Sequence, residues 1–242
     1  MINIIKSEIY KIKGTLLPWI HIVLPIAYSL LFYVALKTTG LKNFEESDIV
    51  QTYFMLLGAA MPIIFSFITS KVVDMEIGAG KFQVLLSTTK SRTKAYIGKL
   101  IVLEIGFVLS LTLSITIFAI LTGYQNISDW LVEFFLILIS SLSIYMIHLW
   151  VSIELSSGAS IGLGFLETMI ALLSMTVIGD SIWYFIPCTW GSRLPASYIM
   201  MSNSFFYKEL RLWGFAAFII TLALFISSII WFNKWDGKSI SE

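Results

Sequence analysis

Six long apolar segments restrict this chain more than any other feature of its sequence. A helix that crosses a membrane needs about 20 mainly apolar residues, and six segments meet that length: 16–36, 51–69, 100–121, 131–153, 159–178 and 212–232. The chain is 57% hydrophobic and 13% charged, whereas soluble domains carry about 25% charged residues. These properties predict an all-α integral membrane protein with six transmembrane helices in a single transmembrane domain, residues 1–242.

Basic residues are distributed unequally between the two sides that six spans would define. Lysine and arginine favour the cytoplasmic side of a membrane. With the N-terminus inside, the inner segments hold eleven basic residues and the outer segments hold five, which are Lys37, Lys42, Arg193, Lys208 and Arg211. The count predicts a multi-pass protein of the cell membrane with both termini in the cytoplasm.

The longest polar passage between two apolar segments covers residues 71–99, with six basic and two acidic side chains. Within it, Phe82, Leu85 and Leu86 follow helical spacing and form an apolar face about one turn long. A short cytoplasmic helix with basic flanks is suited to docking a soluble partner. The alternative is an ordinary basic loop that fixes the topology, and the pattern alone does not separate the two.

The first fourteen residues, 1–14, form a separate amphipathic pattern. Ile2, Ile5, Ile9 and Ile12 recur at helical spacing between charged side chains, which is typical of a helix in the plane of the inner leaflet. The alternative is a frayed basic terminus. No small-residue cleavage pattern follows the first apolar segment, so we expect it to be retained as a membrane helix.

Residues 179–211 are expected outside the cell, yet they are rich in aromatic and apolar side chains. Pro187 and Pro195 divide the segment on either side of Trp190. We expect short re-entrant helices that dip into the outer leaflet and are protected by the bundle. An amphipathic segment on the membrane surface is the alternative.

The sequence excludes several kinds of chemistry. The GAGK tetrapeptide at 78–81 is not a phosphate-binding loop, because Met75 and Phe82 stand where that motif needs a glycine and a serine or threonine. A lone cysteine, Cys188, excludes an intrachain disulfide and a cysteine-rich metal site. The two histidines lie outside any HExxH pattern, and no basic face is interleaved with aromatics for nucleic acid. We therefore expect a chain that is not an enzyme and holds no metal or cofactor.

Glu167 lies near the middle of the fifth apolar segment. A carboxylate there costs about 2.5–3.5 kcal/mol even on the milder insertion scales. It is therefore expected either on a translocation path or in a hydrogen-bonded contact between helices. His148 is expected to make a polar contact across the fourth span, with proton relay as the alternative. Glu104, Glu133 and Glu154 lie near predicted span ends, where we expect them to reach water.

The order of these features resembles the permease subunits of type-2 ABC exporters. An SExYKxK sequence at residues 7–13 precedes six spans, with a cytoplasmic loop between spans two and three. More narrowly, the chain resembles the permeases of lantibiotic immunity transporters. The residues that carry this likeness are Glu76, Gly80, Gln83, the LLST sequence at 85–88, Arg92, Tyr96 and Lys99.

The resemblance implies that residues 1–14 are an elbow helix and that the loop is a coupling helix docked on a separate ATPase subunit. The implied coupling residues are Glu76, Gly78, Gly80, Phe82, Gln83, Leu85 and Leu86. It also implies two copies of that ATPase, which carry the ATP and Mg²⁺, and a second related permease. The implied function is expulsion of a lantibiotic-type antimicrobial peptide from a bacterial plasma membrane, which gives the producer self-immunity.

Two other functions fit the same sequence. A membrane anchor or sensor without transport would recruit a cytoplasmic partner through residues 71–99. An ion-coupled secondary transporter would use Glu167 and need no ATPase, although no second half-repeat is visible and six spans would require a dimer.

Overall fold

The structure is a computed structural model that describes residues 1–80, 82, 91–124, 127–180, 182–199 and 204–237. Across these ranges the regular structure is helical, and no strand occurs. The elements in order are α1 (Ile2–Ile12), α2 (Leu17–Thr38), η1 (Gly40–Asn43), α3 (Glu46–Gly78), α5 (Arg92–Thr122), α6 (Ile127–Glu154), α7 (Ser157–Ser174), η2 (Val177–Gly179), η3 (Trp183–Phe185), η4 (Pro187–Thr189), α8 (Trp190–Ile199) and α9 (Ser204–Lys234).

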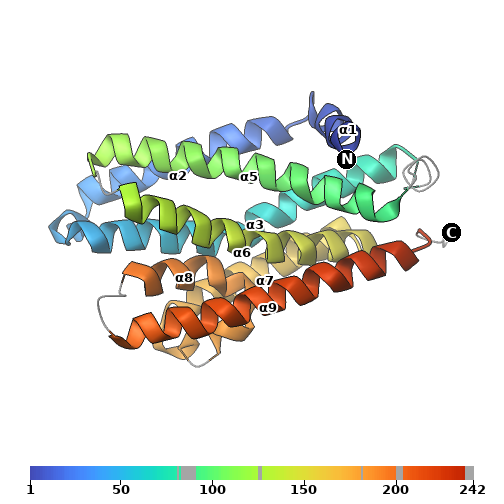
Figure 1. The fold of residues 1–242 in the computed structure, drawn as a ribbon. Helices are drawn as coiled ribbons and strands as arrows, with labels where there is room; N and C mark the ends of the chain where they lie inside the picture. Colours follow the sequence, from blue (N-terminus) through green and yellow to red (C-terminus); the bar gives the residue numbers. More distant parts are fainter. Residues whose placement is uncertain (81, 83–90, 125–126, 181, 200–203, 238–242) are drawn as a thin grey trace.

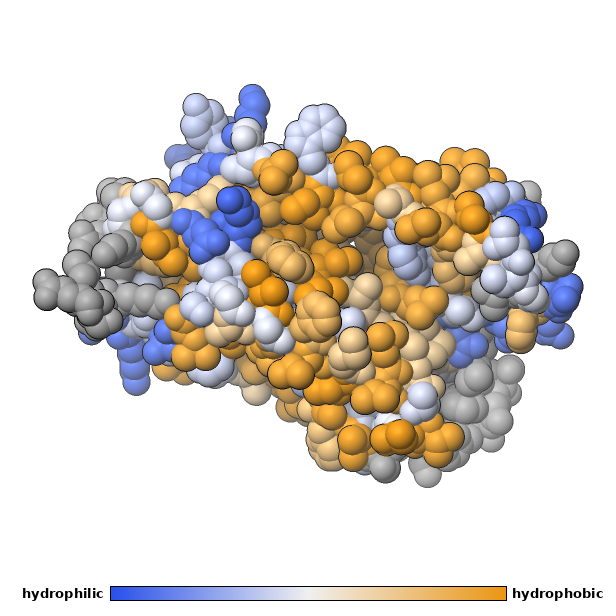
Figure 2. All heavy atoms as spheres, turned by 180° about the vertical axis from the view of Figure 1, so that it is seen from behind, coloured by the Kyte–Doolittle hydropathy of each residue, from blue (hydrophilic) through white to orange (hydrophobic). Residues whose placement is uncertain are grey.

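Six of the described helices are long and apolar enough to cross a membrane, as the sequence predicts: α2, α3, α5, α6, α7 and Arg211–Lys234 of α9. The surface in Figure 2 is apolar around its middle and polar towards both ends. Such a belt matches a hydrocarbon layer bounded by water on each side. The chain is therefore a multi-pass membrane protein.

The N-terminus and the end of α9 lie at the same end of the bundle (Figure 1), which we call the terminal end. Helix α1, the last turn of α3 and the first turn of α5 also lie there. The first turn of α6 and the last turn of α8 lie at the opposite end. An even number of spans requires this placement of the termini.

Helices α3 and α5 are longer than a bilayer requires. They contain 33 and 31 residues, which corresponds to roughly 50 and 46 Å, whereas the hydrocarbon layer is about 30 Å thick. The two helices therefore extend beyond the spans that the sequence predicts at 51–69 and 100–121. Helix α3 continues to Gly78 and α5 begins at Arg92, because nothing in these polar turns breaks a helix and their charges lie beyond the hydrocarbon.

The fifth span ends earlier than the sequence predicts, at Ser174 instead of residue 178. The Ser174 hydroxyl donates to the Ala171 carbonyl over 2.7 Å. Gly179 then folds back so closely that a Cβ there would lie 2.4 Å from the Ser174 carbonyl oxygen. The chain therefore turns tightly into the short helices η2 to η4.

Helix α3 forms the centre of the packing, and small residues permit its two closest approaches. A Cβ on Gly58 would lie 1.9 Å from the carbonyl oxygen of Gly191 in α8, and one on Gly164 of α7 would lie 2.4 Å from the Ser66 hydroxyl. Small residues allow helices to approach closely in membranes, where packing replaces the hydrophobic effect as the main attraction. These two positions therefore hold α7 and α8 against α3.

Pro62 lies inside α3, where a proline removes one hydrogen bond and bends the helix. The neighbouring Ile63 N–H donates to the Thr168 hydroxyl of α7 over 3.1 Å. A polar backbone group inside a membrane must find such a partner within the protein. Helix α7 therefore supplies both the close packing and the hydrogen bond that this bend requires.

Candidate functional site

Four charged side chains meet at the terminal end of the bundle, and we call them the ion cluster: Glu8 and Lys11 of α1, Glu76 of α3 and Lys99 of α5. The Lys99 ammonium lies 2.6 Å from a Glu8 oxygen and 2.8 Å from a Glu76 oxygen. The Lys11 ammonium lies 2.6 Å from the other Glu8 oxygen and 2.7 Å from the same Glu76 oxygen. Each ammonium therefore bridges both carboxylates and joins three helices.

Burial makes this arrangement sensitive to the loss of any one charge. Glu8, Glu76 and Lys99 are each 6% exposed or less, so water contributes little to their stabilisation. Two carboxylates and two ammoniums leave no net charge, which is the condition under which buried ions are tolerated. Burial lowers the pKa of Lys11, but its hydrogen bonds and charge interactions with Glu76 and Glu8 outweigh that effect, and its pKa is raised.

Helix α1 is also fixed by a close steric contact. A Cβ on Gly98 of α5 would lie 2.6 Å from the Ile4 Cγ2 atom. Ile4 can pack here because residue 98 has no side chain. Two adjacent residues of α5 therefore fix α1: Gly98 leaves space for Ile4, and Lys99 pairs with Glu8.

The chain after α3 turns sharply and packs against the end of α9. Gly80 and Phe82 have φ values of +122° and +66°, and a positive φ is uncommon for a residue as large as phenylalanine. The Phe82 side chain is 4% exposed and meets Trp235 edge to face, with ring centroids 5.1 Å apart. Phe82 is therefore an internal anchor at the place where the sequence predicts an exposed apolar face.

Arg92, at the start of α5, makes a second connection to the end of α9. Its guanidinium donates to the backbone carbonyls of Asn233 over 3.0 Å and Trp235 over 2.8 Å. Carbonyls at a helix C-terminus lack partners within the helix and attract cations. The residues on both sides of 83–90 are therefore attached to α9.

The predicted coupling residues fall into three groups. Glu76 belongs to the ion cluster, while Gly78 ends α3 and is followed by Gly80 and Phe82 in the turn. Gln83, Leu85 and Leu86 lie outside the described residues.

A second polar cluster lies inside the bundle, where the sequence predicts a contact for Glu167 and His148. The His148 Nε2 and Glu167 Oε2 atoms lie 3.0 Å apart, at an angle outside the range of a hydrogen bond. The other ring nitrogen of His148 lies 3.0 Å from the Ser160 hydroxyl. Ser160 and Glu167 are two turns apart on α7, so both face the same histidine of α6.

Cys188 of η4 lies near this cluster. Burial raises the pKa of its thiol to about 12, and the nearby Glu167 charge adds to the effect. A thiol with so high a pKa is not a nucleophile or a ready metal ligand. Among the described residues, no group of three or more histidine, cysteine or acidic side chains could hold a metal ion.

The segment between α7 and α9 is packed into the bundle. Trp190 is 1% exposed, and its indole N–H donates to the Tyr184 carbonyl over 3.2 Å. Pro187 begins η4 and Pro195 lies within α8. The three residues singled out from the sequence therefore shape the short helices that contact α3 at Gly58.

The expectation that Glu133 reaches water is wrong, whereas Glu104 is half-buried. Glu133 has no exposed surface, because helix packing covers it despite its place near the start of α6. One oxygen of Glu104 accepts from Ser141 over 2.8 Å, and the other is buried without a hydrogen-bond partner among the described residues. Glu154, by contrast, is exposed as expected. Distance from a helix end is thus a poor guide to burial in this bundle.

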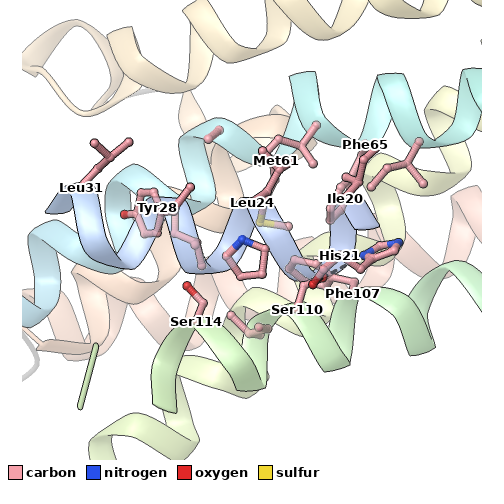
Figure 3. Close-up of a pocket in the computed structure, with 17 residues that line it drawn as sticks. Ile20, His21, Leu24, Tyr28, Leu31, Met61, Phe65, Phe107, Ser110 and Ser114 are labelled. Atoms are coloured by element: carbon pink, nitrogen blue, oxygen red, sulfur yellow. Dashed lines mark hydrogen bonds between the residues drawn. The ribbon is translucent and has the colours of Figure 1, made fainter. Parts of the chain in front are cut away.

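An apolar cavity of about 270 Å³ lies between α2, α3 and α5. Figure 3 shows Leu24 of α2, Met61 and Phe65 of α3 and Phe107 of α5 around it. His21 and Ser110 are among the few polar residues on its wall, and the Ser110 hydroxyl lies 2.8 Å from the imidazole Nδ1. The surface of the cavity is therefore mainly hydrocarbon.

No protein-family model matches the chain, and neither does any curated protein or solved structure. The functional assignment consequently rests on the residues and their geometry.

Replacing Lys99 with methionine should destabilise the folded chain. Glu8 and Glu76 would keep Lys11 as their shared cation, which leaves one negative charge uncompensated. Breaking a buried ion pair costs about 3–5 kcal/mol, and we expect a loss of that size in the free energy of unfolding measured in detergent micelles.

The matched control is Lys94→Met, which removes an exposed lysine from the same helix and should change stability by less than about 0.5 kcal/mol. Adding Glu8→Gln to Lys99→Met restores neutrality and should recover part of the loss. Equal losses for Lys94→Met and Lys99→Met would contradict the role given to the ion cluster.

Proposed function

We propose that this chain is the membrane-spanning subunit of an ATP-driven exporter of the type-2 ABC class. The cargo is an amphipathic antimicrobial peptide of the lantibiotic type, which the complex expels from the membrane to protect the producing cell. ATP and Mg²⁺ bind to a separate ATPase, present in two copies. A second, related permease completes the complex.

The observation that carries this proposal is the position of the ion cluster. It ties α1 to the ends of α3 and α5, the two helices that flank residues 79–91. Both helices exceed the thickness of the hydrocarbon layer by more than 15 Å, on the order of three turns. A force applied to the connection by an external motor would therefore reach three helices together.

The contacts of Phe82 and Arg92 extend this connection to a fourth helix. Because Phe82 packs on Trp235 and Arg92 bonds to the end of α9, a displacement of the flanking residues would also pull on α9. This arrangement suits a coupling segment, whose task is to convert docking of an ATPase into helix movement. An ordinary tether would need no such anchors.

In the proposed complex, the terminal end faces the cytoplasm of a bacterial cell and both termini lie inside. The excess of basic residues on that side supports this orientation. Helix α1 then lies as an elbow in the inner interface, and η2 to α8 lie as re-entrant helices in the outer leaflet.

The cavity between α2, α3 and α5 supports an apolar or amphipathic cargo. Leu24 and Leu31 line it and are also exposed on the outer surface of α2, where lipid would surround them. A hydrophobic face of a peptide in the bilayer could reach this wall without first entering water. A polar solute would find few hydrogen-bond partners there.

Replacing Leu85 with aspartate should separate the chain from its ATPase. A charge at this proposed docking position would remain unpaired in the interface with the ATPase, which weakens binding strongly. We expect loss of co-purification of the ATPase and loss of peptide resistance in cells, with the level of the permease in the membrane unchanged.

The matched control is Leu155→Asp. It makes the same change at an exposed leucine between α6 and α7, which is the other connection at the terminal end. This variant should retain the ATPase. Undiminished co-purification by the Leu85→Asp variant would remove the docking role from residues 71–99.

A membrane anchor or sensor would use the same surface, so co-purification alone does not separate it from an exporter. The two differ in energetics, because an anchor has no cargo to couple to ATP hydrolysis. Cargo-stimulated ATP hydrolysis by the reconstituted complex supports the exporter.

The pairing of His148 with Glu167 favours one further candidate, an ion-coupled transporter. In the exporter, Glu167 has a packing role that glutamine can fill, so Glu167→Gln should keep at least about half of the transport rate. Dissipating the proton gradient while ATP is held constant should leave the transport rates of the unmodified chain and of the Glu167→Gln variant unchanged. Transport that stops with the gradient, and in the Glu167→Gln variant, would instead establish ion coupling.

A further inference from the structure

Glu133 is a buried carboxylate without a partner. It lies near the start of α6, with none of its surface exposed. Neither of its oxygens has a hydrogen-bond partner among the described residues. A buried polar group costs free energy unless it is hydrogen-bonded, and this carboxyl group has no such partner in the described part of the chain.

Two polar groups lie beside Glu133 towards the opposite end of the bundle. Asp129 precedes it by four residues on α6, which places the two carboxylates on the same helical face. The Tyr198 hydroxyl of α8 donates to Asp129 over 2.9 Å. Burial raises the pKa of Tyr198 to about 12, aided by that hydrogen bond and by the charges of Asp129 and Glu133.

Asp129 and Tyr198 retain more exposed surface than Glu133 does. Asp129 and Tyr198 are each half-buried, and Asp129 lies roughly 6 Å closer to the start of α6. Asp129 and Tyr198 therefore place partly exposed polar groups beside the buried carboxyl group of Glu133.

The charge balance at this end of the bundle favours a cation. Residues 37–50, 122–133 and 179–211 together contain seven acidic and five basic side chains, although the whole chain has a net charge of +1. Arg193 already donates to Asp180 and does not reach Glu133. None of the basic side chains that the structure describes is hydrogen-bonded to Glu133, and a cation from outside the chain would supply that partner.

We propose that Asp129, Glu133 and Tyr198 form a binding site for a primary ammonium group, such as a lysine side chain or the N-terminal amine of a peptide cargo. That the cargo is a peptide rests on the proposed function. An ammonium has three N–H donors, which match two carboxylates and one phenol oxygen. Ca²⁺ would require six or more oxygen ligands.

The site lies at the end of the bundle that faces outward in the proposed complex. It would hold the cationic part of the cargo while the apolar part contacts the bundle, which gives the transporter a preference for cationic amphipathic molecules. Charge and donor geometry both contribute to this preference.

The test uses the purified full-length chain in phosphatidylcholine nanodiscs without an ATPase, so it is independent of transport. Ethylammonium is titrated at constant ionic strength while thermal unfolding is followed by tryptophan fluorescence. We expect the midpoint to rise by about 3–5 °C at a concentration tenfold above the dissociation constant. Glu133→Gln and Asp129→Asn should each abolish this rise.

The matched control is Glu154→Gln, which makes the same change at an exposed position of α6 and should keep the full rise. If Glu133→Gln does not fold, Asp129→Asn decides the result, because its half-buried side chain tolerates replacement more readily. The absence of a rise in the unmodified chain would overturn the site. An equal rise in the Glu133→Gln variant would do the same. So would an equal rise with sodium or tetramethylammonium, because these two cations lack N–H donors.

Two further arms separate the sources of the ammonium. A short lysine-containing peptide should raise the midpoint in the phosphatidylcholine nanodiscs. Replacing that lipid with phosphatidylethanolamine, in the absence of peptide, should not. A rise produced by phosphatidylethanolamine alone would assign the site to a lipid headgroup and overturn the peptide assignment.

Discussion

The neutralisation of four charges at the terminal end is the constraint on which the rest of the structure depends. Glu8, Glu76 and Lys99 are almost inaccessible to water, so each must find its counter-charge within the protein. The counter-charges come from three separate helices, and none of these helices can shift without exposing or unpairing an ion. A surface helix such as α1 would otherwise be held by little more than its apolar face.

The remaining contacts make the attached helices move as rigid units. Glycines bring α7 and α8 into contact with the middle of α3, and Thr168 replaces the hydrogen bond that is disturbed beside Pro62. A rigid central helix transmits displacement along its length, because closely packed interiors yield little. The cavity between α2, α3 and α5 is therefore lined by two of the helices that carry the ion cluster, α3 and α5.

The sequence predicts the features that depend on local composition, and it misses those that depend on which helices meet. Six apolar segments are enough to predict six spans. The same pattern assigns residues 71–99 to a loop, because charge excludes them from the hydrocarbon without excluding them from a helix.

Glu167 and His148 are recognised as costly polar residues, and their pairing agrees with that expectation. Glu133 is misjudged because its burial comes from neighbouring helices. The signal for Lys99 was present, as a single lysine directly before an apolar span, but its two carboxylate partners lie 23 and 91 residues away.

The most direct test of the central claim is whether α1 stays attached to α5 during the ATP cycle. Spin labels at Lys13→Cys and Lys94→Cys, in a Cys188→Ser background, would report the distance between the two helices in the assembled complex by electron paramagnetic resonance. The account predicts that this distance changes by less than about 2 Å between the nucleotide-free and ATP-trapped states. A separation of about one helical turn, ~5 Å or more, would contradict it.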